Sequence, residues 1–220
     1  MPGSLAAKRT PLFRNESCRS YAPPGLSSVS QFVIPICQPT YSWTQKECQQ
    51  FWDEIVRAGS TDEIGVHFIS SVVYLEEGQA TIAVKPLKLV IDGQQRDTTV
   101  TLLLLALAEM LSGLPDEHEG PFDGFSPAKI RQYYLTNPLD RKEKRFKLLL
   151  LDTDRATLIA VVDPSVVAAP QEPSIRILQK HAFFLEQLRH PPMILPWSAV
   201  ASASCWWWMW SLPAIWTIRS

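Results

Sequence analysis

The sequence predicts an α+β fold in which a mixed unit, over residues 31–112, is followed by a helical region, over residues 113–189. Three observations support this fold class. The first unit contains short apolar stretches of strand length, and segments with helical spacing of apolar residues alternate with them. A stretch rich in Gly and Pro, near residues 113–125, then interrupts the pattern. Helical patterns resume after it, so we place a domain boundary there.

The first elements of the mixed unit follow from local signals. Residues 31–36 form an extended apolar stretch, because the prolines in and after it oppose a helix. Thr44 and Glu47 fit a capping box, so a helix is expected to start at Thr44 and to end near Gly59. Its apolar residues form one stripe, which predicts one buried face.

Three further strands and a second helix are expected beyond this first helix. We predict a strand over residues 67–75, a turn over 76–79, and strands over 81–84 and 87–91. The helix expected over residues 98–111 is apolar almost all round, which predicts that it is buried.

Composition and charge narrow the class of protein. The chain has 220 residues, of which 46% are hydrophobic, enough for one full domain and part of another. With 21 basic and 22 acidic side chains, no whole-chain basic field would hold nucleic acid, so any DNA contact must be local. The four cysteines lack metal-ligand spacing, which argues against a zinc site and a disulfide scaffold. Without a signal-peptide pattern, the expected location is cytoplasmic.

Both ends of the chain differ from its centre. Residues 1–30 are rich in Ser, Pro, Gly and Arg without a period, which predicts a disordered leader. Residues 190–220 hold six of the eight tryptophans and one charged side chain. A one-base shift of the Trp206 to Trp210 codons gives Leu-Val-Val-Asp-Val, a strand pattern, so we expect an out-of-frame tail. The alternative is a membrane anchor over residues 193–218, which internal prolines and mid-segment tryptophans disfavour.

The stretch between the third strand and the second helix, residues 92–99, reads Asp-Gly-Gln-Gln-Arg-Asp-Thr-Thr. Free amides at a helix start favour a phosphate, and the planar fork of Arg96 could grip it. Asp92 could hold Mg²⁺, while Gln94 or Gln95 could orient a water toward a terminal phosphoryl group. The alternative is a common Asp-Gly turn with solvated glutamines, in which Thr98 only caps the helix.

Three spaced motifs carry a resemblance to a known family. The stretch from Asp92 to Thr99 resembles the DGQQR-x-TT signature of the DUF262 family, the N-terminal domain of GmrSD-type restriction endonucleases. Residues 34–43 resemble its IPxYQRPYxW motif and are followed by a WDDI-like Trp52 to Ile55. Residues 67–71 resemble its HFxGS motif. The resemblance covers about residues 31–189.

The resemblance implies a ParB/sulfiredoxin-like domain followed by the start of a helical domain. It also implies that the DGQQR segment binds and hydrolyses a nucleoside triphosphate, GTP or another, with Mg²⁺. The expected catalytic residues are Asp92, Gln94, Gln95 and Arg96, with Asp92 also the metal ligand. The residues expected to bind the nucleotide are Gly93, Arg96, Thr98, Thr99, Gln38 and His67. For His67 the alternative is a strand residue that faces water.

Complete members of the family often end in an HNH-type nuclease domain and cut DNA that carries modified bases. No such His constellation follows residue 125, so we expect a truncated sensor domain that relies on a separate HNH nuclease subunit or domain. Departures from the family motifs suggest a decayed copy; they are Cys37, Pro39, Thr40, Ser70 and Asp97. The Asp97 carboxylate is expected to compete with phosphate for Arg96.

Two other functions stay open at this point. A ParB-like DNA-binding module without hydrolysis would use a basic run for phosphate contacts; the alternative is a solvated face. The run comprises Arg131, Arg141, Lys142, Lys144, Arg145 and Lys147. A membrane-tethered protein would use the apolar tail, although no membrane is expected for the leading hypothesis.

Overall fold

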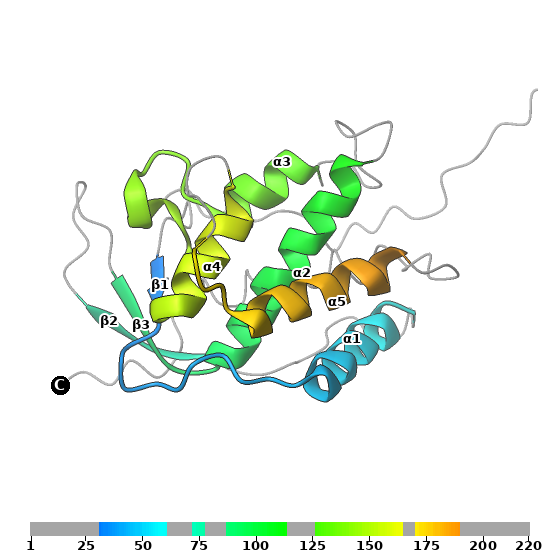
Figure 1. The fold of residues 1–220 in the computed structure, drawn as a ribbon, viewed down its shortest axis with the longest axis horizontal. Coiled ribbons are helices and arrows are strands. Elements are labelled where there is room, and N and C mark those ends of the chain that lie inside the picture. The colour runs from blue at the N-terminus through cyan, green and yellow to red at the C-terminus, as the bar shows by residue number, and fades with distance from the viewer. Residues whose placement is uncertain (1–30, 61–71, 78–86, 114–125, 165–169, 190–220) are drawn as a thin grey trace, which may run out of the picture.

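The computed structural model describes residues 31–60, 72–77, 87–113, 126–164 and 170–189 (Figure 1). Its sheet has four strands in the order β2-β3-β1-β4. Strand β1 (Gln31–Val33) runs parallel to both neighbours, β3 (Leu87–Asp92) and β4 (Leu148–Leu149). Strand β2 (Val73–Glu77) pairs antiparallel with β3. This mixed sheet and the helices around it confirm the predicted α+β class.

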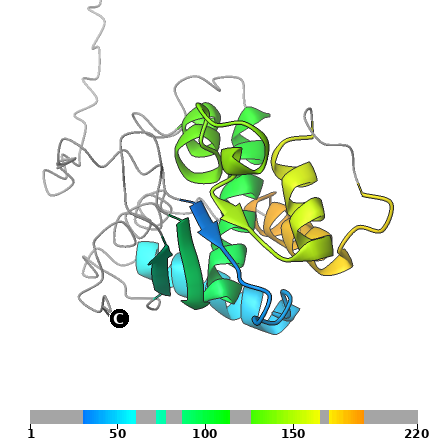
Figure 2. The same ribbon diagram turned by 90° about the vertical axis from the view of Figure 1, so that its left-hand side faces the viewer.

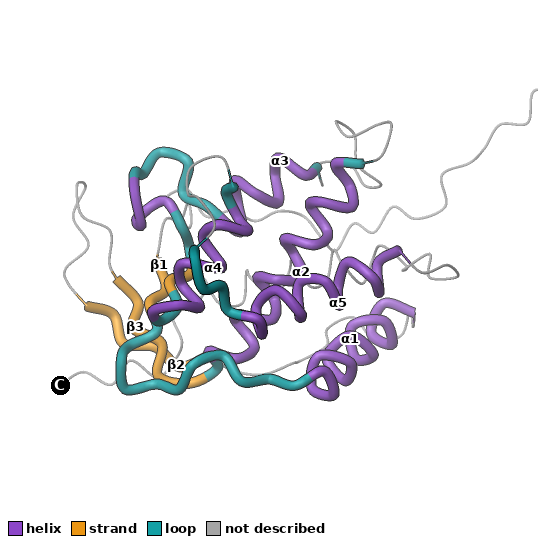
Figure 3. Tube along the Cα trace, in the orientation of Figure 1, coloured by secondary structure: helices purple, strands orange, loops and turns teal. Residues whose placement is uncertain are grey.

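Helix α2 (Gln94–Ser112) leads from the end of β3 away from the sheet, and other helices lie on either side of it (Figures 1 and 3). Strands gather at one end of the molecule, and Figure 2 looks at that end. The other helices are α1 (Gln45–Ser60), α3 (Pro127–Ile130), α4 (Asp152–Val162) and α5 (Ile175–Arg189), with a π-helical turn at Arg131–Leu135 and a 3₁₀ turn at Lys142–Arg145.

Helix α1 confirms the predicted stripe and start signal. Phe51 and Trp52 are buried and pack against Phe184 of α5, with ring centroids 6.5 Å apart in both pairs. The backbone N–H of Thr44 donates to the Glu47 carboxylate at 2.6 Å, and the Thr44 hydroxyl donates to the same oxygen. The helix therefore begins one residue after its predicted cap, at Gln45.

Helix α2 is buried as predicted, but its predicted start at residue 98 is wrong. It begins at Gln94, because Gly93 adopts φ 96° and turns the chain from β3 into the helix. A positive φ is the conformation that glycine adopts without steric cost. The hydroxyls of Thr98 and Thr99 donate to the carbonyls of Gln94 and Gln95, each at 2.8 Å. Thr98 therefore lies inside the helix and does not cap it.

Strand β2 corrects the turn predicted over residues 76–79. Glu76 and Glu77 are the last residues of this strand, and they pair with Lys88 and Leu87 of β3. Backbone pairing with β3 therefore extends beyond the point where the two acidic residues suggested a turn. The predicted strand over 81–84 and residues 67–71 of the first strand lie outside the described residues.

Strand β4 was not predicted, since residues 113–189 showed helical patterns. Its two residues are too few for a recognisable period. It is nevertheless joined firmly to β1, because Phe32 N donates to Lys147 O at 2.7 Å and Ile34 N to Leu149 O at 2.9 Å. The sheet therefore contains residues from both sides of the predicted boundary, whose own residues 114–125 are not described.

The predicted leader and tail, residues 1–30 and 190–220, also lie outside the described residues. Within the part that is described, none of the helices combines the length and the apolar character needed to cross a membrane.

Candidate functional site

The turn from β3 into α2 exposes one carboxylate beside a helix start. Asp92 is exposed at the end of β3, and its Oδ1 accepts a hydrogen bond from Gly93 N at 2.8 Å. Asp97 N donates to Gly93 O at 3.0 Å, which closes the first helical turn. The amides that precede Asp97 in this turn have no carbonyl partner within the helix, so the helix start favours an anion.

A second segment, residues 38–43, runs alongside this first turn and is held there by Gln95. The side-chain oxygen of Gln95 accepts from Ser42 N at 2.8 Å and from Trp43 N at 3.3 Å. Its amide nitrogen donates to Thr40 O at 3.2 Å. The Gln95 side chain therefore makes three hydrogen bonds to the backbone of the 38–43 segment.

Gln38 and Thr99, two of the predicted nucleotide-binding residues, also make contacts within the protein. Gln38 Nε2 donates to Ile91 O at 2.8 Å, which ties the beginning of the 38–43 segment to β3. Thr99 is fully buried, and its hydroxyl lies 2.8 Å from the Tyr41 hydroxyl. His67 lies outside the described residues.

Tyr41 of the 38–43 segment contacts four helices. Its N–H donates to Oδ2 of Asp154 in α4 at 2.9 Å, and its carbonyl accepts from Arg176 of α5 at 3.2 Å. Its hydroxyl contacts Thr99 of α2 and lies 3.6 Å from Cys48 Sγ of α1. Burial raises the pKa of the Tyr41 phenol far above its ordinary value, so the ring stays neutral.

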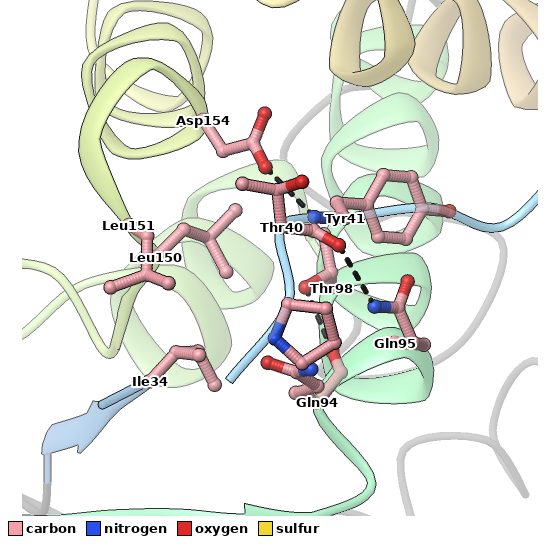
Figure 4. Close-up of a pocket in the computed structure, with 10 residues that line it drawn as sticks. Ile34, Thr40, Tyr41, Gln94, Gln95, Thr98, Leu150, Leu151 and Asp154 are labelled. Atoms are coloured by element: carbon pink, nitrogen blue, oxygen red, sulfur yellow. Dashed lines mark hydrogen bonds between the residues drawn. The ribbon is translucent and has the colours of Figure 1, made fainter. Parts of the chain in front are cut away.

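A small pocket lies between the 38–43 segment, the start of α2 and the β4–α4 junction (Figure 4). Its empty volume is about 200 Å³, open solvent included. The enclosed space itself is about 10 Å³, close to what one water molecule needs, so a phosphate group would bind at the mouth of the pocket and not inside it. Its polar lining residues are Thr40, Gln94, Gln95, Thr98 and Asp154, and its apolar walls include Ile34, Leu150 and Leu151.

Gln94 differs from Gln95 in having no hydrogen bond from its side chain to any described residue. It is 8% exposed and lines the pocket. Its amide atoms are not among the fully buried polar atoms that lack a partner, so they keep access to the open space of the pocket. The amide of Gln94 is therefore available to a ligand or a water in the pocket.

Arg96 lies outside this pocket and is placed by an aromatic ring. Its guanidinium carbon is 5.9 Å from the ring centroid of Trp43, within reach of a cation–π interaction. Both side chains are half-buried. Because Gln95 holds the backbone of Trp43, the same segment that lines the pocket also supports Arg96.

No ion pair joins Asp97 and Arg96 in this structure, which contains no phosphate. Adjacent helical residues point in different directions, and Asp97 is only 2% exposed. Neither of its carboxylate oxygens accepts a hydrogen bond from a described residue. Burial raises the pKa of Asp97 well above its ordinary value; nearby Asp92 adds to this shift and Arg96 opposes it.

The basic run is only partly available for DNA. Lys147 is 3% exposed, Arg145 pairs with Asp163 at 2.8 Å, and Arg131 donates to Val162 O at 3.1 Å. Arg141, Lys142 and Lys144 are exposed. A strong phosphate-binding patch would need more free cations than these three.

Some contacts of the site were not found from the sequence. Asp154 and Arg176 reach Tyr41 across 113 and 135 residues, separations that no local spacing can indicate. The tyrosine itself belonged to the recognised IPxYQRPYxW-like motif, which was the one available signal. Among the described residues, no three His, Cys, Asp or Glu side chains cluster as a metal site would require.

Comparison with known families agrees with the motif resemblance. The model of the GmrSD restriction endonuclease N-terminal domain matches residues 25–186, well over half of the chain. The comparison with curated proteins gives no match. The matched range includes the sheet, the start of α2, the 38–43 segment and Asp154. The chain therefore belongs to the family of GmrSD restriction endonuclease N-terminal domains, DUF262.

Proposed function

We propose that this domain binds a nucleoside triphosphate, with the phosphates at the start of α2, and serves as the nucleotide-binding sensor of a restriction system that acts on modified DNA. The observation that carries the proposal is the Gln94 amide. The Gln94 side chain makes no hydrogen bond to a described residue, and it lines a water-sized pocket that opens at the start of α2. Family membership supplies the link to restriction of DNA.

Each residue of the motif takes a role that its contacts support. The amides of the first α2 turn and the Gln94 side chain would hold a phosphate group, and Gln94 would orient a water for attack on it. Arg96, supported by Trp43, would neutralise phosphate charge from outside the pocket. Gln95 holds the 38–43 segment and acts as a positioning residue.

Asp92 is the residue that would hold Mg²⁺. It is exposed, and among the described residues only Gly93 N donates a hydrogen bond to its carboxylate. One carboxylate fits this ion, which binds through one or two carboxylates together with phosphates and waters. The bound ion would supply charge neutralisation on the phosphates.

The complete system needs a nuclease as well as this sensor. We propose that an HNH nuclease, as a further domain or a separate subunit, cuts DNA in response to the nucleotide state. The three exposed cations at residues 141–144 could add weak, salt-sensitive DNA contacts, but they do not support a DNA-binding module as the main function.

Calorimetric titration of the full chain with GTP, ATP and CTP, each with Mg²⁺, tests the proposal. We expect at least one to bind, and Arg96→Ala to weaken it about 10- to 100-fold, because a charge-assisted contact is worth about 1.5–3 kcal/mol. Arg141→Ala, which removes an exposed arginine elsewhere, is the matched control and should leave binding unchanged. A folded wild-type chain that binds none of the three nucleotides would overturn the proposal.

A further inference from the structure

Asp154 is a buried carboxylate contributed by a helix that sequence analysis did not connect to the site. It lies in the first turn of α4, is 7% exposed and lines the pocket beside α2. Its Oδ2 accepts from Tyr41 N at 2.9 Å, and no cation pairs with it among the described residues. A buried anion of this kind is expensive to desolvate, so the bond to Tyr41 is its main compensation.

Both backbone polar groups of Tyr41 are bonded by side chains from α4 and α5. Asp154 of α4 takes its N–H, and Arg176 of α5 donates to its carbonyl. Gln95 of α2 holds the residues on either side, Thr40 and Ser42. The position of the 38–43 segment relative to α2 is therefore set jointly by three helices.

This segment forms part of the pocket and also supports Arg96. Thr40 and Tyr41 line the pocket with Gln94, and Trp43 lies under the Arg96 guanidinium. A displacement of Tyr41 would move the pocket wall and the Trp43 ring together. Both of the contacts assigned to the nucleotide would then change.

We propose that Asp154 is a positioning residue of the nucleotide site, acting through Tyr41; this inference rests on the proposed function. In Figure 4, Asp154 lies away from Gln94, with Thr40 and Thr98 between them. A carboxylate in direct contact with a phosphate would repel it, which is a second reason to assign Asp154 an indirect role. The inference ties nucleotide binding to helices α4 and α5.

The test compares two substitutions of Asp154 in the full chain by nucleotide titration and thermal melting. Asp154→Ala removes the acceptor for Tyr41 N and should raise the Kd for the bound Mg²⁺–nucleotide at least tenfold. Asp154→Asn keeps an oxygen acceptor at this position and should restore the Kd to within threefold of wild type. Asp152→Asn removes the same charge from an exposed residue of the same turn and should leave the Kd unchanged.

Arg176→Ala provides the second route, because Arg176 is exposed and holds the other side of Tyr41. It should raise the Kd at least threefold with little change in melting temperature, and it decides the outcome if Asp154→Ala does not fold.

Equal Kd values for wild type, Asp154→Ala and Arg176→Ala would overturn the positioning role alone. A loss of binding in folded Asp154→Asn would also overturn it, because the charge itself would then be required. Failure of the wild type to bind any of GTP, ATP and CTP would overturn the proposed function and this inference together.

Discussion

Two adjacent glutamines of one motif have different surroundings in this domain. Gln94 opens onto the pocket without a partner, whereas Gln95 makes three hydrogen bonds to the 38–43 segment. By sequence alone, either residue could orient a water, and their residue type is the same. Successive helical residues point about 100° apart, so only the position of a distant segment decides which one is free.

Asp97 is a buried carboxylate inside α2, and the cost of burying it is measurable. Burial raises its pKa, so the folded state keeps a proton that the unfolded chain releases near pH 4. Above this pH the folded state binds more protons than the unfolded chain. The contribution of Asp97 to the free energy of unfolding therefore falls as pH rises from about 4 toward the raised pKa.

Asp97→Asn should remove this dependence and stabilise the fold at pH 7 by about 1–3 kcal/mol relative to wild type. The gain should shrink as pH falls toward 4, where the carboxyl of the unfolded wild-type chain is only about half ionised. Urea unfolding of both proteins between pH 4 and 8 measures the difference, with Asp152→Asn as a control for the lost charge. A difference that stays constant over this range would contradict the assignment.

At the scale of elements, Gln95 joins α2 to the 38–43 segment and its loss should loosen that contact. Gln95→Ala removes three hydrogen bonds, most of them near solvent, and should lower the free energy of unfolding by about 1–2 kcal/mol. Gln94→Ala removes none and is the matched comparison, with an expected change within about 0.5 kcal/mol. Urea unfolding distinguishes the two; equal losses would show that Gln95 does not hold the segment.

The periodic elements could be predicted from the sequence, and the others could not. The stripe of α1 and the apolar body of α2 follow from residue spacing, and both are confirmed. The start of α2 was missed because its first turn is polar, and its cap is the backbone of Gly93 with no side-chain signal. Strand β4 has two residues, and only its pairing with β1 defines it.

At the scale of the whole molecule, the site depends on contacts between residues more than 100 positions apart. The DGQQR segment was located from its motif, and its position at the carboxyl end of β3 follows from the order of strand and helix. The hydrogen bonds of Asp154 and Arg176 to Tyr41 depend on how α4 and α5 pack beside α2, which a single sequence does not reveal. The recognised motifs therefore locate the DGQQR segment and the 38–43 segment. Asp154 and Arg176, which fix the position of Tyr41, could be found only from the fold.

The most direct test of the central claim is to observe which amides respond when nucleotide is added. The measurement is a ¹⁵N–¹H NMR titration of the deuterated full chain with the Mg²⁺–nucleotide that binds most tightly. We predict the largest chemical-shift changes at the amides of Gly93, Gln94, Gln95 and Arg96, with smaller ones over residues 38–43. Changes confined to residues 141–147, with none at the start of α2, would contradict the account.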